Sequence, residues 1–254
     1  MSGAKGKLYL VPAPLDFGCD TQAPLQDVMP LQTIAIAAKV SHWVCENAKS
    51  TRAYLKRVGE VHALAKPVQA LQIQELPREV HKKGDHSGNF DAKPLLKPAL
   101  DGNDVGLVSE AGMPAIADPG SSVVRAAHDL GIEVVALTGP MSLMLALASS
   151  GLNGQNFAFV GYLPQDAGER GQRIKELESL SLRSGQTQIF IETPYRNAAL
   201  LQALVHTLQA NTRLALSCGL TLDAGVNKSA LVAKWRQDNT SLPLSLPTVF
   251  CIGR

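Results

Sequence analysis

Three short segments rich in glycine and proline are the residues of this chain best suited to form a ligand site. They read VPAPLD (residues 11–16), SEAGMPAIADPG (109–120) and TGPMS (138–142), and each follows an apolar run that favours a buried strand. Glycine lets the backbone approach a ligand closely, and proline keeps a turn rigid. One such loop alone would be an ordinary tight turn, but three at successive strand ends favour a cleft for a small molecule.

The loops lack the two common phosphate-binding patterns. No P-loop segment (GxxxxGK followed by Ser or Thr) is present, and no GxGxxG opens a helix after a strand. The acidic Glu110 within the second loop suits a ligand with ribose hydroxyls or a positive centre better than it suits a phosphate. We therefore expect a ligand whose binding depends little on phosphate groups.

Apolar strands alternate with helical patterns through the first half of the chain, which indicates a mostly parallel sheet with helical crossovers. The predicted strands are KLYLV (7–11), HWVC (His42–Cys45), VGLVS (105–109) and EVVAL (133–137), and the predicted helices span 31–39, 49–58, 93–100 and 121–130. The fold class is therefore α/β, with residues 1–138 as the first domain. The polar segment 74–91 is interpreted as a solvated surface loop, with a lid or substrate arm as the alternative.

Residues 139–254 form the second predicted domain. A helix over 141–150 leads to FAFVGYLP, then to a helix over 168–180, the strand TQIFIE (Thr187–Glu192) and a helix over 197–208. The last predicted strands, RLALSCG, SALVAKW and PTVFCIG, follow with no helix between them. Strands without a helical crossover are joined by turns and run antiparallel, so we expect a mixed sheet here.

Composition excludes several classes of protein. The 254 residues carry a formal charge of only +2, which is too small to indicate that the protein binds a polyanion such as a nucleic acid. The overall charge does not exclude a local basic patch. No secretory leader and no membrane span are expected, so we predict a cytoplasmic protein. The four cysteines show no CxxC spacing and the six histidines are dispersed, so we expect no metal site.

A family resemblance rests on the run from Val105 to Leu152, followed by FVGYLP (159–164). This run resembles the core of the tetrapyrrole methylase family, and within it the branch of small-subunit ribosomal RNA 2′-O-ribose methyltransferases. The comparable stretches of that branch read S-D-A-G-T-P, S-D-P-G, P-G-P and G-F-L-P. LYLVPAPL near the N-terminus is also similar to the branch's first strand and loop.

The resemblance implies a pair of α/β domains, usually in a homodimer, with S-adenosylmethionine in the cleft between the domains. A metal is not required for that chemistry. Glu110 stands where the family usually has Asp. The residues that would surround the cofactor are Pro12, Ser109, Glu110, Ala111, Gly112, Met113, Pro114, Ser142 and Tyr162.

Methyl transfer to a hydroxyl would be helped by a general base, for which Glu46 and Glu192 are the candidates. Each is equally well explained as a surface or loop-capping carboxylate. IETPYR (191–196) resembles a family segment that commonly ends in His-Arg, so Arg196 is predicted either to face the substrate or cofactor, or to pair with a surface acid.

The sequence differs from that of the branch mainly in segments expected to concern the substrate rather than the cofactor. LDFGCD (15–20) stands in place of G-N-L-x-D, and CENAK (45–49) keeps Glu46 and a lysine but loses the Asp-Thr-Arg of A-E-D-T-R. We also expect the chain to lack the small C-terminal helical domain of many such enzymes. Methyl transfer to RNA or a related acceptor is the leading hypothesis. The alternatives are a non-catalytic paralogue that only binds the cofactor and, ranked last, a tetrapyrrole methyltransferase.

Overall fold

The computed structural model describes residues 4–83, 85 and 90–254. The chain divides into two compact units: Met1–Gly18 with Ala23–Pro140, and Cys19–Gln22 with Met141–Arg254. We call them the first and the second unit. Each has its own five-stranded sheet.

The sheet of the first unit is parallel throughout, as predicted. Its strand order is β3-β2-β4-β1-β5, and every neighbouring pair runs in the same direction. The strands are β1 (Leu8–Leu10), β2 (His42–Cys45), β3 (Gln72–Glu75), β4 (Val105–Val108) and β5 (Val134–Ala136). β4 is buried along its whole length, which agrees with its unbroken apolar sequence.

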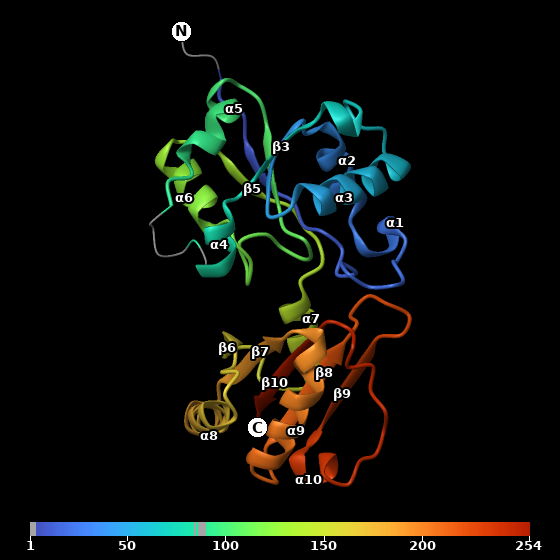
Figure 1. The fold of residues 1–254 in the computed structure, drawn as a ribbon, viewed down its shortest axis with the longest axis vertical. Helices are drawn as coiled ribbons and strands as arrows, with labels where there is room; N and C mark the ends of the chain where they lie inside the picture. Colours follow the sequence, from blue (N-terminus) through green and yellow to red (C-terminus); the bar gives the residue numbers. More distant parts are fainter. Residues whose placement is uncertain (1–3, 84, 86–89) are drawn as a thin grey trace. The chain divides into compact units, whose positions relative to one another are not determined.

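Helices cover both faces of this sheet, as Figure 1 shows. One face packs on α1 (Leu25–Val28), α2 (Leu31–Lys39) and α3 (Ala48–Val61), next to the short 3-10 helix η1 (Val68–Ala70). The other packs on α4 (Arg78–Lys83), η2 (Lys93–Leu96), α5 (Lys97–Leu100) and α6 (Ser121–Asp129). Trp43 and Val44 of β2 are both buried and belong to cores on opposite faces, as consecutive strand residues should.

The second unit has a mixed sheet, which also confirms the prediction. The order is β6-β7-β10-β8-β9; β6 and β7 are parallel, and the remaining neighbours are antiparallel. The strands are β6 (Phe157–Tyr162), β7 (Thr187–Glu192), β8 (Arg213–Cys218), β9 (Val226–Leu231) and β10 (Thr248–Gly253).

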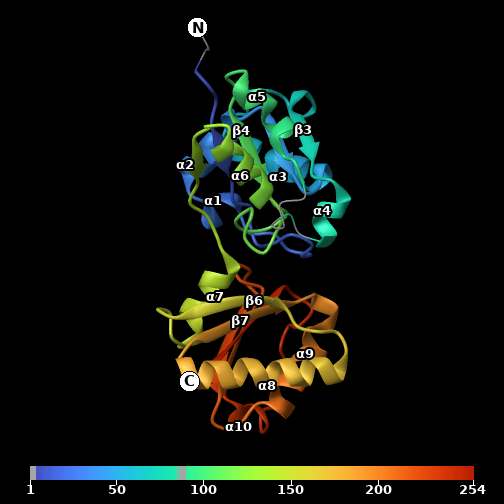
Figure 2. The same ribbon diagram turned by 90° about the vertical axis from the view of Figure 1, so that its left-hand side faces the viewer.

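Helices again cover both faces. α7 (Ser142–Ser150) packs on one face, and α8 (Ala167–Ser184), α9 (Asn197–Thr207) and α10 (Val232–Trp235) pack on the other. A further 3-10 helix, η3 (Pro194–Arg196), links β7 to α9. Figure 2 shows α8 as the long helix beside β6 and β7. Asp166 starts α8 by accepting a hydrogen bond from the Glu169 N–H, and Gly185 ends it with φ +67°.

Two sequence-based assignments were wrong in part. The segment 74–91 is not a loop throughout, because Gln74 and Glu75 belong to β3 and Arg78–Lys83 form α4. β3 lies at the sheet edge and is mostly exposed, so it can consist largely of polar residues. A polar sequence of this kind does not show the apolar pattern from which a strand is predicted. Residues 84 and 86–89 of that segment lie outside the described part.

The predicted strand SALVAKW is also divided. β9 ends at Leu231, and the rest forms α10, where Val232 and Trp235 are both buried against the same core. Residues three apart lie on one face of a helix, but a helix of four residues carries too little periodicity to be distinguished from a strand in the sequence.

Candidate functional site

The three glycine- and proline-rich loops come together within the first unit. β1 lies between β4 and β5, so the loops that follow these strands leave the same edge of the sheet. Ala13 and Gly112 form an antiparallel bridge in which each N–H donates to the other's carbonyl at 2.9 Å. Gly139 packs closely on Pro12, since a Cβ at Gly139 would lie 2.5 Å from the Pro12 Cβ. The predicted convergence of the loops is therefore present.

The position of Gly112 favours glycine because of its backbone conformation. Its φ is +70°, which strains other residues, whereas a Cβ there would make only ordinary van der Waals contact, 3.4 Å from Leu15 Cδ2. The same loop contains Ala115 and Ala117, both with φ +64°. Non-glycine residues with positive φ cost roughly 1–3 kcal/mol each and persist where the surroundings hold them, which is common at functional sites.

Asp85 holds the far end of this loop against α6. Its carboxylate accepts hydrogen bonds from the N–H of Gly120 at 2.9 Å and of Ser122 at 2.9 Å, and from the hydroxyls of Ser121 and Ser122. Burial acts to raise the pKa of Asp85, but these hydrogen bonds outweigh it and lower the pKa below its ordinary value. The start of α6, and with it the end of the loop, is thereby fixed.

Carboxylates gather around the same edge of the sheet. The Ser50 hydroxyl donates to Glu110 Oε1 at 3.2 Å, and the Glu110 N–H donates to Glu46 Oε2 at 3.3 Å. Burial, together with the charges of Glu46 and Glu110, raises the pKa of Asp118 to about 7, although a hydrogen bond from Ser109 acts in the opposite direction. This negative cluster can hold a positively charged group or accept a proton.

The turn after β1 is fixed by an ion pair that the sequence did not reveal. Arg57 of α3 contacts Asp16 through both of its terminal nitrogens, at 2.9 Å each, and donates a third hydrogen bond to the Ala23 carbonyl at 2.8 Å. The Asp16 side chain is only 3% exposed. The partners are 41 positions apart in the sequence, so no local pattern predicts the pair.

Met113 and Pro114 of the second loop face a hollow of about 570 Å³ within the first unit. Its walls come from β1, β5 and α6 in addition to the loop, and they are mainly apolar. Leu10, Ala136, Ile116 and Val124 supply most of the apolar lining, and Arg125, His128 and Asp129 supply polar groups. Part of the second loop, including Met113 and Pro114, therefore lines a hollow that a small molecule could enter.

Three of the predicted residues in the second unit, Tyr162, Glu192 and Arg196, interact with one another. Glu192 ends β7 and binds Arg196, with Arg196 Nε 2.5 Å from Oε1 and Nη2 3.1 Å from Oε2. Tyr162 ends β6, is 57% exposed and acts electrostatically on Arg196. Of the two alternatives for Arg196, pairing with an acid is therefore observed. Ser142 is the first residue of α7 and lies apart from this group in the chain.

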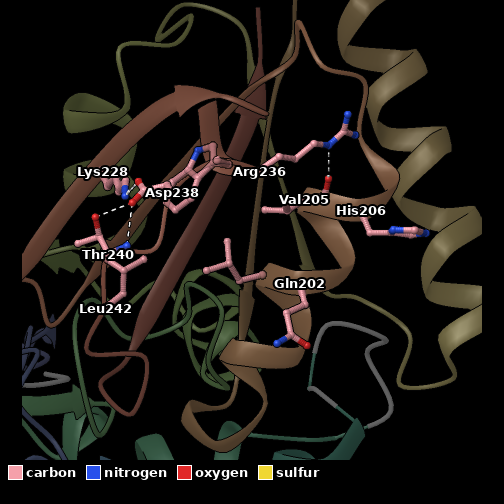
Figure 3. Close-up of a pocket in the computed structure, with 10 residues that line it drawn as sticks. Gln202, Val205, His206, Lys228, Arg236, Asp238, Thr240 and Leu242 are labelled. Carbon is pink, nitrogen blue, oxygen red and sulfur yellow. Dashed lines mark hydrogen bonds and ion pairs between the residues drawn. The ribbon is translucent and has the colours of Figure 1, made fainter. Parts of the chain in front are cut away.

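A hollow of about 650 Å³ in the second unit involves none of the predicted site residues. Figure 3 shows Lys228, Asp238 and Thr240 on one side of it and Arg236 with Val205 on the other. Its charged groups are paired internally: Lys228 contacts Asp238, and Arg236 donates to the carbonyls of Val205 and Leu208. These pairings explain its polar lining without a ligand.

The sequence and the fold of this chain are similar to those of known proteins. The sequence pattern of the tetrapyrrole (corrin/porphyrin) methylases matches residues 30–231. A protein of Mesorhizobium japonicum called ribosomal RNA small subunit methyltransferase I is 33% identical over 214 residues, which are 84% of this chain and 63% of that protein. A protein of the same name from Escherichia coli is 29% identical over 219 residues, 86% of this chain and 66% of that protein.

The chain thus spans less than two thirds of the length of these relatives. Among solved structures, that of the methyltransferase CobJ superimposes with a TM-score of 0.56 at 18% identity, over 98% of this chain and 94% of that one. At this identity the likeness shows the fold alone. The extent of the sequence matches identifies the chain as a member of the tetrapyrrole methylase family.

Proposed function

We propose that the chain is an S-adenosylmethionine-dependent methyltransferase that modifies a ribose 2′ hydroxyl of small-subunit ribosomal RNA. The observation that carries the proposal is the interlocked set of loops at the carboxyl edge of the first sheet, with the Ala13–Gly112 bridge beside the carboxylates of Glu46, Glu110 and Asp118. The names of the relatives support ribosomal RNA as the acceptor.

The loop residues fit this cofactor. S-adenosylmethionine carries positive charge on its sulfonium and amino groups, and a cluster of carboxylates favours a cation at that place. Gly112 carries no side chain, and glycine lets the backbone approach a ligand closely. The residues that would hold the cofactor in the first unit are Pro12, Ser109, Glu110, Ala111, Gly112, Met113 and Pro114. The roles of Ser142 and Tyr162, and the predicted cleft between the domains, stay predictions.

The bound cofactor supplies an electrophilic methyl group, and the chain must align the acceptor hydroxyl, exclude water and take up a proton. We assign the proton to the Glu46 carboxylate, which follows β2 and is held by the Glu110 N–H at 3.3 Å. Glu192 is engaged by Arg196 through two contacts. We therefore assign Glu192 to positioning Arg196 and prefer Glu46 as the base.

A turnover assay separates this proposal from a non-catalytic, cofactor-binding paralogue. The purified chain is incubated with S-adenosylmethionine labelled in its methyl group and with small-subunit ribosomal RNA. We expect label in the RNA, at a linkage that resists alkaline hydrolysis because the 2′ hydroxyl is blocked. Cofactor binding without transfer to RNA or to a cell extract would instead support the non-catalytic alternative.

Two other expectations accompany the proposal. A homodimer and a cytoplasmic location stay predictions. Among the described residues, every helix is too short or too polar to cross a membrane.

A further inference from the structure

Tyr195 projects into solvent at the carboxyl end of β7. Its side chain is 80% exposed, the highest value for a large apolar residue in the described part of the chain. It lies in η3, which begins at Pro194, so the backbone beneath the ring is constrained. The exposed ring is available to bind a partner, and burying its apolar faces against one would be favourable.

Arg196 is fixed beside this ring. Its Cζ lies 5.2 Å from the centroid of the Tyr195 ring, and Glu192 holds the guanidinium through two contacts. The hydrogen bond that Arg196 donates to Glu192 is the main cause that raises the pKa of Arg196 above its ordinary value. Glu192 is itself anchored, because it accepts a hydrogen bond from the Thr193 N–H at 2.7 Å. The arginine therefore supports the ring in one orientation.

The charges of this group decide what it can bind. Glu192 offsets the charge of Arg196, so the pair offers little net attraction to a phosphate. What remains accessible is the ring of Tyr195 with a planar guanidinium beside it. Unpaired RNA bases stack on aromatic rings and on arginine planes, and such stacking tolerates different base sequences.

We propose that Tyr195, supported by Arg196, stacks on an unpaired base of the RNA acceptor; this rests on the proposed function. The surroundings favour a base over an apolar protein partner, because the exposed rings of Tyr195 and Tyr162 border the charged Glu192–Arg196 pair rather than a broad apolar patch. Tyr195 would thus position the acceptor strand without taking part in methyl transfer.

Fluorescence of a Tyr195→Trp variant tests the stacking directly. The native tryptophans, Trp43 and Trp235, are only 1% and 6% exposed, so the new indole is the exposed reporter. We expect small-subunit ribosomal RNA to quench its emission with saturation, and a fully paired RNA duplex to quench it much less, since duplex bases are already stacked.

Phe157→Trp provides the matched control. Phe157 is 39% exposed and begins β6, at the opposite end of the second sheet from Tyr195. Equal quenching of both variants would overturn the proposal, because it would indicate non-specific contact. Quenching of the Tyr195→Trp variant by S-adenosylhomocysteine alone would also overturn it, since the ring would then contact the cofactor's adenine.

Affinity measurements distinguish the contribution of the Tyr195 ring to RNA binding from that of its hydroxyl. Tyr195→Ala should weaken binding of small-subunit ribosomal RNA about 10- to 100-fold, whereas Tyr195→Phe should stay within about threefold of the native affinity. The slope of log affinity against log salt should be unchanged in Tyr195→Ala, because no phosphate contact is lost.

The outcomes also distinguish this inference from the proposed function. Native RNA affinity in Tyr195→Ala overturns the stacking role alone, as does equal loss in the Phe and Ala variants. Failure of the native chain to bind small-subunit ribosomal RNA overturns the RNA acceptor as well. Calorimetric binding of S-adenosylmethionine, which should be the same in all the Tyr195 variants, checks that the fold and the cofactor site are intact.

Discussion

Glu46→Gln should lower the rate of methyl transfer to RNA by about 10²- to 10⁴-fold, the contribution expected of a positioned general base. The amide keeps nearly the same shape and can still accept the hydrogen bond from the Glu110 N–H, but it cannot take up the proton of the acceptor hydroxyl. The affinity for S-adenosylmethionine should change only a few-fold. Single-turnover rates with labelled cofactor measure the effect.

Glu60→Gln is the matched control for this substitution. Glu60 is an exposed residue of α3, the helix that follows Glu46 in the chain, and its replacement should leave the rate unchanged. A rate for Glu46→Gln within a factor of about two of the native rate would contradict the assigned role. The proton would then have to leave through another group or through solvent.

Asp118→Asn should stabilise the chain by roughly 1–4 kcal/mol above pH 7 and have little effect near pH 4. Burial first, and then the charges of Glu46 and Glu110, raise the pKa of Asp118 from its ordinary value of 3.8 to about 7. Between these values the folded chain keeps a proton that the unfolded chain releases. The native stability attributable to Asp118 is therefore lost as the pH rises through this window.

Denaturant unfolding at several pH values measures this effect. The free energy of unfolding of Asp118→Asn minus that of the native chain should grow between about pH 4 and pH 7 and then level off. Asp20→Asn, at an exposed position, is the matched control. A difference that stays flat across this range, or falls as the pH rises, would contradict the raised pKa of Asp118.

The regular elements of both sheets could be predicted because their apolar runs are unambiguous. β4 is buried at every position, and its sequence VGLV contains no polar residue. Gly106 within it is explained by packing, since a Cβ there would lie 2.6 Å from the Trp43 ring. β3 was missed because an edge strand can be polar, and α10 was interpreted as a strand because four residues carry too little periodicity.

Only some residues of the candidate site could be predicted from the sequence. Loop residues such as Gly112 and Glu110 could be singled out because their types and spacing are informative by themselves. Asp118 stands in the same loop, but its raised pKa depends on burial and on Glu46, which precedes it by 72 positions in the numbering. Asp85 and Arg57 act on partners 34 or more residues away. Such contacts follow from the fold and leave no local pattern.

For Arg196, the local sequence suggested two possible partners but did not decide between them. Glu192 and Arg196 are four apart and are joined through η3, so pairing was one of the two outcomes foreseen for Arg196. The exposure of Tyr195 could not be foreseen, because tyrosine is intermediate between the mostly buried and the mostly exposed residue types. The structure thus reveals a surface feature of the second unit that sequence reasoning passed over.

The measurement that tests the central proposal most directly is calorimetric titration of the purified chain with S-adenosylmethionine and S-adenosylhomocysteine. We predict binding of both with micromolar dissociation constants, and its loss in Gly112→Trp, because Gly112 has φ +70° and lies in the proposed cofactor loop. Gly154→Trp, at a glycine with open space around it, should bind like the native chain. Circular dichroism should show both variants folded. Absence of binding to the folded native chain would contradict the proposed methyltransferase activity.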